Sequence, residues 1–261
     1  MAGKSEDPRD AQILEVRGLT VRFGGLEALQ GLSVSIPSGK IVAVIGPNGA
    51  GKTTLLNAIS GVYRLDAGEI LFGGRPIHSL RPFEIASLGI RRTFQQVQLF
   101  AHMTALENIM VGLHCRTRSG FVKGMLHLPG ERSEEKRIRA KALALIDDFA
   151  LNPKAHWPAG HLSVAEQKRL EIARAMASEP RLLLLDEPVA GLNLRETEAM
   201  GELILRLKKT GPTVLLVEHN MHLVMGISDW VVVLHHGSKI GEGEPSQIQK
   251  DRRVIEAYLG G

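Results

Sequence analysis

The stretch that decides the fold is Gly46-Pro47-Asn48-Gly49-Ala50-Gly51-Lys52-Thr53-Thr54. It fits the pattern G-x-x-x-x-G-K-[ST] of a phosphate-binding P-loop. An apolar run at 41–45 precedes it, and 55–59 reads as a helix, so the order is strand, glycine-rich loop, helix. Glycines let the backbone curl so that successive N–H groups point at an anion, and the helix N-terminus adds the positive end of its dipole. The sequence therefore predicts a nucleoside triphosphate site.

Two side chains of this loop have expected partners. Lys52 can reach the β- and γ-phosphates, and the Thr53 hydroxyl can bind Mg²⁺. The competing interpretation is a glycine turn that carries a lysine by chance. Four fixed positions between a strand and a helix favour the P-loop.

Composition narrows the class of protein. The 261 residues suffice for one α/β domain, or for a domain with a subdomain. The single cysteine, Cys115, excludes an internal disulfide, and His114 beside it lacks the further ligands of a metal site. The net charge of +4 permits contact with anionic lipid or nucleic acid without requiring either. No apolar run approaches the roughly 18 residues that span a bilayer, and residues 1–12 are too polar for a signal peptide.

The pattern of apolar residues predicts two kinds of strand. Apolar and polar residues alternate through 13–36, which is typical of half-buried antiparallel strands, and 68–74 reads as another short strand. Continuous apolar runs instead suit parallel strands that are buried on both faces, with helices between them. These runs lie at 41–45, 182–185, 214–217 and 231–234.

Residues 98–160 show no strand-like run and predict an inserted helical subdomain. Thr104 and Glu107 have the spacing of a capping box, and 131–150 has apolar residues at helical spacing. The segment 114–130 reads as a loop with basic residues Arg116, Arg118 and Lys123. A solvated loop is favoured there over a face for a membrane or a partner.

Two of the apolar runs end in candidate catalytic side chains. Asp186 and Glu187 follow 182–185; the aspartate can hold Mg²⁺, and the glutamate can act as general base for a water that attacks the γ-phosphate. His219 follows another strand, and the carboxyl ends of parallel strands face the ligand crevice. Without a P-loop in the chain, the alternative interpretations would be that the two acidic residues only cap a strand and that the histidine is only a solvated surface residue.

Together these elements resemble the ATP-binding cassette (ABC) family, over roughly residues 13–261. Leu162-Ser163-Val164-Ala165-Glu166 stands where the family has its LSGGQ signature, and 190–193 matches its D-loop. The resemblance implies further roles: Gln95 as the glutamine of the Q-loop that also contacts Mg²⁺, Phe23 as the aromatic residue on adenine, and His219 as the γ-phosphate sensor. Ser163 and Ala165 would contact the nucleotide of a second ATPase subunit.

The resemblance also implies an architecture: a single ATP-binding domain over 1–261, with ATP and Mg²⁺ as its ligands. The expected fold is α/β, a P-loop NTPase core with a flanking antiparallel β-sheet and an inserted helical subdomain. Its expected parts are the catalytic core at 12–95 and 176–240, the helical subdomain with the signature at 96–175, and a C-terminal helix at 241–261.

Within the family the chain resembles the longer ATPase of branched-chain amino acid importers. Residues 23–29, 92–95, 107–109, 190–193 and 254–260 carry this likeness. It implies a second ATPase subunit in a heterodimer (or a homodimer), two transmembrane permease subunits and, indirectly, a solute-binding protein. It also implies a peripheral place on the cytoplasmic face of the membrane and no nucleic-acid partner.

Two residues depart from the wider family pattern. Ala165 replaces the second signature glycine, and its Cβ is expected to hinder close approach of backbone N–H groups to a γ-phosphate. Asn193 replaces the D-loop aspartate, which suits the branched-chain subgroup.

Three other functions stay open from the sequence. An ATPase that powers lipid or lipopolysaccharide export shares much of this pattern. A cassette ATPase linked to nucleic acid usually carries two cassettes or long coiled coils. A P-loop kinase or GTPase would lack the segment 162–175.

Overall fold

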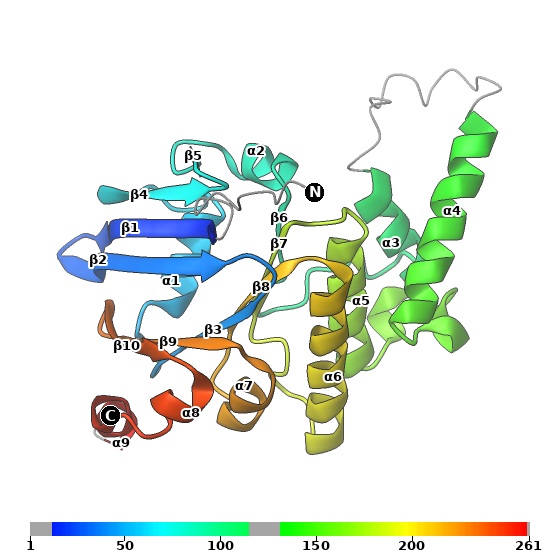
Figure 1. The fold of residues 1–261 in the computed structure, drawn as a ribbon. Coiled ribbons are helices and arrows are strands. Elements are labelled where there is room, and N and C mark those ends of the chain that lie inside the picture. The colour runs from blue at the N-terminus through cyan, green and yellow to red at the C-terminus, as the bar shows by residue number, and fades with distance from the viewer. Residues whose placement is uncertain (1–11, 115–130, 260–261) are drawn as a thin grey trace, which may run out of the picture.

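The computed structural model describes residues 12–114 and 131–259. They form a four-stranded antiparallel sheet, a six-stranded mixed sheet, and a group of helices beside the larger sheet (Figure 1). The features predicted at Cys115, Arg116, Arg118 and Lys123 lie outside the described residues. The predicted α/β fold with a flanking antiparallel sheet and inserted helices is confirmed.

The strands and helices have the following bounds. The strands are β1 (Gln12–Phe23), β2 (Leu26–Pro37), β3 (Ile41–Ile45), β4 (Ala67–Phe72), β5 (Arg75–Pro76), β6 (Ile90–Arg92), β7 (Leu182–Asp186), β8 (Thr213–Val217), β9 (Trp230–His235) and β10 (Ser238–Gly243). The helices are α1 (Lys52–Ile59), α2 (Pro82–Ser87), α3 (Ala105–His114), α4 (Glu131–Asp148), α5 (Val164–Met176), α6 (Leu194–Thr210), α7 (Met221–Ile227), α8 (Pro245–Ile248) and α9 (Arg252–Leu259). Two short 3₁₀ helices are η1 (Asn152–Lys154) and η2 (Ala159–His161).

The antiparallel sheet has the order β2-β1-β4-β5. Its long hairpin β1–β2 closes at the pair Phe23 and Leu26. The alternation predicted for 13–36 is observed, because residues such as Leu14, Val16 and Leu19 face the core. This sheet packs over α1 (Figure 1). The hairpin end of β1 therefore lies on the same side of the molecule as the P-loop, which precedes α1.

The larger sheet has the order β10-β9-β3-β8-β7-β6. β6, β7, β8, β3 and β9 pair in parallel, and β10 closes the edge antiparallel to β9. Every residue of β3, β7 and β8 is buried, which explains their continuous apolar runs. The sequence did not predict β6, which has only three residues, or β10, in which Ile240 is the only large apolar side chain.

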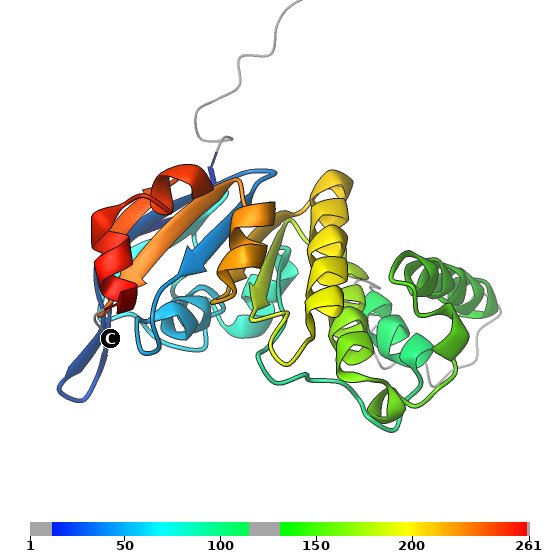
Figure 2. The ribbon, with the colours of Figure 1, turned by 90° about the horizontal axis from the view of Figure 1, so that it is seen from below.

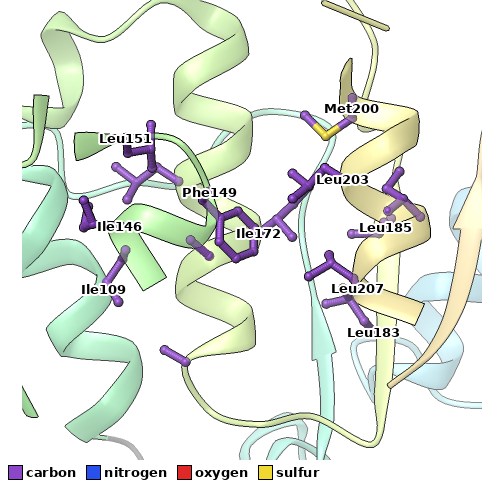
Figure 3. Close-up of a cluster of buried hydrophobic side chains, with 14 of the residues drawn as sticks. Ile109, Ile146, Phe149, Leu151, Ile172, Leu183, Leu185, Met200, Leu203 and Leu207 are labelled. Carbon is purple, nitrogen blue, oxygen red and sulfur yellow. The ribbon is translucent and has the colours of Figure 1, made fainter. Parts of the chain in front are cut away.

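The helices α3, α4 and α5 form one side of the molecule (Figures 1 and 2). The capping box predicted at α3 is present: Thr104 N–H and hydroxyl both donate to Glu107 Oε2 at 2.8 Å, and Glu107 N–H donates to Thr104 Oγ1 at 3.2 Å. Figure 3 shows Ile172 of α5 among side chains of α3, α4, α6 and β7. One apolar core thus joins the helical group to the larger sheet.

The C-terminal part differs from the predicted boundary at residue 241. β10 continues to Gly243, and two short helices, α8 and α9, follow it instead of one. β10 was not predicted because most of its residues are polar or glycine. Across the described residues, no helix has the length and apolar character needed to cross a bilayer.

Candidate functional site

The P-loop links β3 to α1 and has the curled backbone that its glycines predict. Gly49, Ala50 and Gly51 have φ angles of 79°, 53° and 100°. Successive residues with positive φ turn their N–H groups toward one side of the loop, and α1 begins immediately afterwards at Lys52. This geometry fits a phosphate group at the helix N-terminus.

Two glycines of the loop are also required by packing. A Cβ on Gly46 would lie 2.1 Å from the carbonyl oxygen of Leu234 in β9. A Cβ on Gly51 would lie 2.7 Å from the carbonyl oxygen of Ala28 in β2. The loop is therefore fixed from two sides, by one strand of each sheet.

Lys52 lies inside the loop that precedes it. Its Nζ donates to the carbonyl oxygens of Gly46 at 2.6 Å and Pro47 at 2.9 Å, and the residue is buried. Burial lowers the pKa of the Lys52 ammonium, while the nearby carboxylates of Glu187 and Asp186 oppose that shift.

Asp186 ends β7 and forms a buried ion pair with Arg92 of β6. The distance from Arg92 Nη2 to Asp186 Oδ2 is 2.9 Å, and Nη1 of the same arginine donates to Asn57 of α1 at 2.6 Å. Sequence reasoning did not assign a role to Arg92. It is the first residue of the motif Arg92-Thr93-Phe94-Gln95, three residues before the Q-loop glutamine, and this position was the available signal.

Glu187 is brought together with Gln95 and His219. Gln95 Nε2 donates to Glu187 Oε2 at 3.1 Å, and His219 Nδ1 lies 3.9 Å from Glu187 Oε1. Glu187 has a φ of 48°, which L residues rarely adopt, and its N–H donates to Val217 at 2.9 Å. Three side chains from the ends of three different segments therefore converge on one point.

A second carboxylate, that of Glu218, is buried next to the cluster of Glu187, Gln95 and His219. Glu218 is fully buried and accepts hydrogen bonds from the N–H groups of Val189 at 3.1 Å, His219 at 3.0 Å and Asn220 at 3.2 Å. It joins the loop after β7 to the loop after β8. Glu218 was not among the predicted site residues, although an acidic residue that directly follows an apolar strand was the available signal.

The described residues fit Mg²⁺ as well as phosphate. Thr53 is exposed in the first turn of α1, Asp186 ends β7, and Gln95 follows β6, the strand paired with β7. No group of three His, Cys, Asp or Glu residues in 12–114 and 131–259 could bind a metal by itself.

Phe23 lies at the end of β1 and is 45% exposed. Its ring contacts Tyr63 edge-on, with centroids 5.0 Å apart and an interplanar angle of 74°. An exposed ring at a strand end has a free face for stacking. Thr54 follows Thr53 in the first turn of α1 and is partly buried.

The signature segment forms the start of α5. Ser163 caps the helix: its hydroxyl accepts from Glu166 N–H at 3.3 Å, and its own N–H donates to Glu166 Oε2 at 2.8 Å. Lys154 Nζ also donates to that oxygen, at 2.8 Å. Among the described residues, no hydrogen bond or ion pair connects 162–166 with the P-loop of the same chain.

The two departures from the family pattern have simple local explanations. Ala165 lies in the first turn of α5 with right-handed backbone, so alanine causes no backbone strain there. Asn193 is the N-cap of α6, and its side chain accepts from Glu196 N–H at 3.0 Å. Asparagine and aspartate cap helices equally well, so this replacement preserves the local structure.

Comparison with known proteins supports the same assignment. The family model of the ABC transporter matches residues 29–190, and the model of the branched-chain amino acid ATP-binding cassette transporter matches 238–261. The chain is 45% identical over 249 residues to the high-affinity branched-chain amino acid transport ATP-binding protein BraF of Pseudomonas aeruginosa, covering 95% of this chain and 98% of that protein. It is 42% identical to LivG of Escherichia coli K12, a protein of the same description, with the same coverage.

Solved structures agree with the relatives. A nucleotide-free ATP-binding cassette from an ABC transporter has a TM-score of 0.83 and 32% identity, covering 96% of this chain and 100% of that one. An ATP-binding cassette in its ADP conformation also has a TM-score of 0.83, with 33% identity and coverage of 96% and 99%. Similarity along nearly the whole chain excludes a P-loop kinase or a GTPase: the chain belongs to the ABC transporter family and is an ATPase of that family.

Proposed function

We propose that this ATPase powers the uptake of branched-chain amino acids or similar small amphipathic solutes. The observation that carries the proposal is the near full-length similarity to BraF and LivG, together with the match of 238–261 to a branched-chain amino acid transporter model. The two matches cover different parts of the chain, since the general family model ends at residue 190.

The chemistry that we propose assigns one task to each convergent side chain. The P-loop amides of 48–51 and the Lys52 ammonium bind the phosphates. Glu187 accepts a proton from the attacking water, and His219 contacts the γ-phosphate. Gln95 donates to the same glutamate at 3.1 Å, which favours a link between the Q-loop and the general base.

Magnesium would be held by Thr53, Asp186 and Gln95, and it supplies positive charge against the β- and γ-phosphates. Arg92 already holds Oδ2 of Asp186 at 2.9 Å, so the second oxygen of that carboxylate is the one best placed for a cation. Phe23 would stack on the adenine with its exposed face. Stacking uses the ring face that every base offers, so it would discriminate little between ATP and GTP.

The proposed assembly contains two ATPase subunits, two transmembrane permease subunits and a solute-binding protein, with this subunit peripheral at the cytoplasmic face. Each ATP would lie between the P-loop of one ATPase and the signature of the other. Helices α5 and α1 lie apart in Figures 1 and 2, which supports this arrangement, because Ser163 and Ala165 then need a second subunit to meet a nucleotide.

The test is reconstitution with the membrane subunits encoded beside this gene. Vesicles that contain the complex and internal ATP should accumulate labelled leucine, isoleucine or valine when the binding protein is present outside. Glu187→Gln should abolish the accumulation. Copurification with lipid-export membrane subunits, or ATPase stimulation by nucleic acid at a stated salt concentration, would overturn the proposal.

A further inference from the structure

Two buried charged residues of α5 have no role in the chemistry described so far. Lys168 is 5% exposed and Glu171 is 4% exposed. They are three residues apart and therefore lie on one face of the helix. Buried charges are costly unless polar groups compensate them, so the contacts of these two side chains need an explanation.

Lys168 contacts the main chain of the proposed general base. Its Nζ donates to the carbonyl oxygen of Glu187 at 2.9 Å. Among the described residues it forms no ion pair, although burial lowers its pKa and four carboxylates oppose that shift: Glu171, Glu218, Glu187 and Asp186. Within the described part of the chain, the bond to the Glu187 carbonyl oxygen is therefore the only side-chain hydrogen bond that Lys168 forms.

That peptide group needs external support. A non-glycine residue with φ of 48° costs free energy, and such a conformation persists only where the surroundings impose it. Glu187 is held at its N–H by Val217 and at its carbonyl by Lys168, both at 2.9 Å. These two bonds hold the backbone from which the Glu187 side chain extends.

Glu171 contacts the main chain of the Q-loop. Its Oε1 accepts from the N–H groups of Phe94 at 3.4 Å and Gln98 at 3.1 Å, one residue before and three residues after Gln95. One turn further along α5, Arg174 donates to the carbonyl oxygen of Gln98. Burial raises the pKa of Glu171, and the amides of Gln98 and Phe94 oppose that shift.

The contacts close into a ring. α5 holds the Q-loop through Glu171, the Q-loop places Gln95 against the Glu187 carboxylate, and Lys168 returns from the Glu187 carbonyl to α5. The helix itself is fixed in the apolar core by residues such as Ile172 (Figure 3). Its first turn is the signature segment.

We propose that Lys168 and Glu171 are positioning residues for ATP hydrolysis, which hold the Glu187 backbone and the Q-loop backbone at a fixed distance from the signature helix. In the proposed two-subunit assembly, a shift of α5 on contact with the other subunit's nucleotide would move Gln95 and Glu187 of this chain together. The inference rests on the catalytic role of Glu187 put forward above.

The test compares five variants in the reconstituted transporter. Lys168→Met removes the donor at similar volume, and Lys168→Arg restores one. Glu171→Met removes the acceptor, and Glu171→Gln keeps a carbonyl oxygen. Lys208→Met is the matched control, because Lys208 is another partly buried lysine that joins two elements, through Asp229 at 2.6 Å.

We expect Lys168→Met and Glu171→Met to lower kcat roughly tenfold or more, because a misdirected base reduces transition-state stabilisation. KM for ATP should change less than about twofold, since the P-loop is untouched. Lys168→Arg and Glu171→Gln should recover most of the rate, and Lys208→Met should resemble the parent protein. Thermal unfolding of each variant shows whether it is folded.

Two results would overturn the inference: kcat of Lys168→Met equal to that of Lys208→Met, or equal losses of kcat in Lys168→Met and Lys168→Arg. Glu187→Gln, measured in parallel, separates this failure from a failure of the proposed chemistry. If Glu187→Gln retains turnover, the role of the glutamate itself is wrong. If it loses turnover while Lys168→Met does not, only the positioning role is wrong.

Discussion

Glu187 combines a strained backbone with two side-chain neighbours, Gln95 and His219, and this makes it the residue whose replacement is most informative. Glu187→Gln keeps the volume and one hydrogen-bond acceptor while removing the base. Turnover should fall by roughly 10²–10⁴ because proton acceptance is lost. Phosphate release from the assembled complex and a nucleotide titration measure turnover and binding separately.

Binding of ATP should survive in that variant, since the P-loop is unchanged. Glu242→Gln is a suitable control, because this acid lies in the edge strand β10 and pairs with Lys239 at 3.0 Å. Phosphate release from Glu187→Gln close to that of the unmodified complex would show that another group is the base.

Lys52→Ala should act on binding itself. The ammonium lies within the loop at 2.6 Å and 2.9 Å from the carbonyl oxygens of Gly46 and Pro47. Its loss removes the positive charge expected against the β- and γ-phosphates. Titration with ATP and Mg²⁺ should show a clearly weaker Kd, and an unchanged Kd would refute the assignment.

Some residues of the candidate site could be predicted from the sequence, and others could not. Lys52 and Asp186 stand in motifs with fixed spacing, so their positions were predictable. Arg92 and Glu218 were missed because key partners come from distant segments: Asp186 and Asn57 for the arginine, and a backbone N–H group of the loop after β7 for the glutamate. Contacts of this kind have no local pattern.

Helix α5 shows how one element serves several purposes. Its first turn is the signature, its buried face carries Lys168 and Glu171, and its apolar residues fill the core. Periodicity predicted the helices and the buried strands, since both have regular apolar spacing. It failed for β6 and β10, because a three-residue strand and a polar edge strand are defined by hydrogen bonds to their neighbours.

Ala165→Gly tests whether the first turn of α5 limits the rate. The backbone of Ala165 is right-handed, so strain cannot be the reason for an effect. The reason that we propose is that the methyl group hinders the approach of the helix N–H groups to a γ-phosphate. Removing it should raise ATP turnover of the complex, because closer donors stabilise the transition state.

Glycine also weakens a helix by up to about 1 kcal/mol. This loss of helix stability has to be separated from the gain in turnover that removal of the methyl group is expected to give. Ala105→Gly, in the first turn of α3, measures that cost in a helix of the same group. Turnover of Ala165→Gly that is no higher than that of the unmodified complex would mean that the methyl group does not hinder the site.

The complete transporter should have two unequal ATP sites if its two ATPases differ. The site on this chain's P-loop has Lys52, Asp186, Glu187 and His219 in place and would be completed by the other subunit's signature. The site on the other P-loop would receive Ala165. Glu187→Gln should therefore reduce turnover more than the equivalent substitution in the other ATPase, as ATPase rates of the two complexes can show. Equal losses would remove the support for unequal sites.

Strand β3 has a place in the molecule that extends beyond the nucleotide. Ile41 belongs to the core shared with the helices, Val42 and Val44 to the core under the antiparallel sheet, and Ala43 and Ile45 to the core near the C-terminus. None of these cores can open fully while β3 remains paired between β8 and β9. Amide hydrogens of β3 should therefore exchange with deuterium only through global unfolding, and those of the edge strand β10 through local fraying. If ATP binds the loop that leaves β3, as we propose, bound nucleotide should slow exchange in all three cores by the same factor. Protection confined to the P-loop would show that the cores open independently.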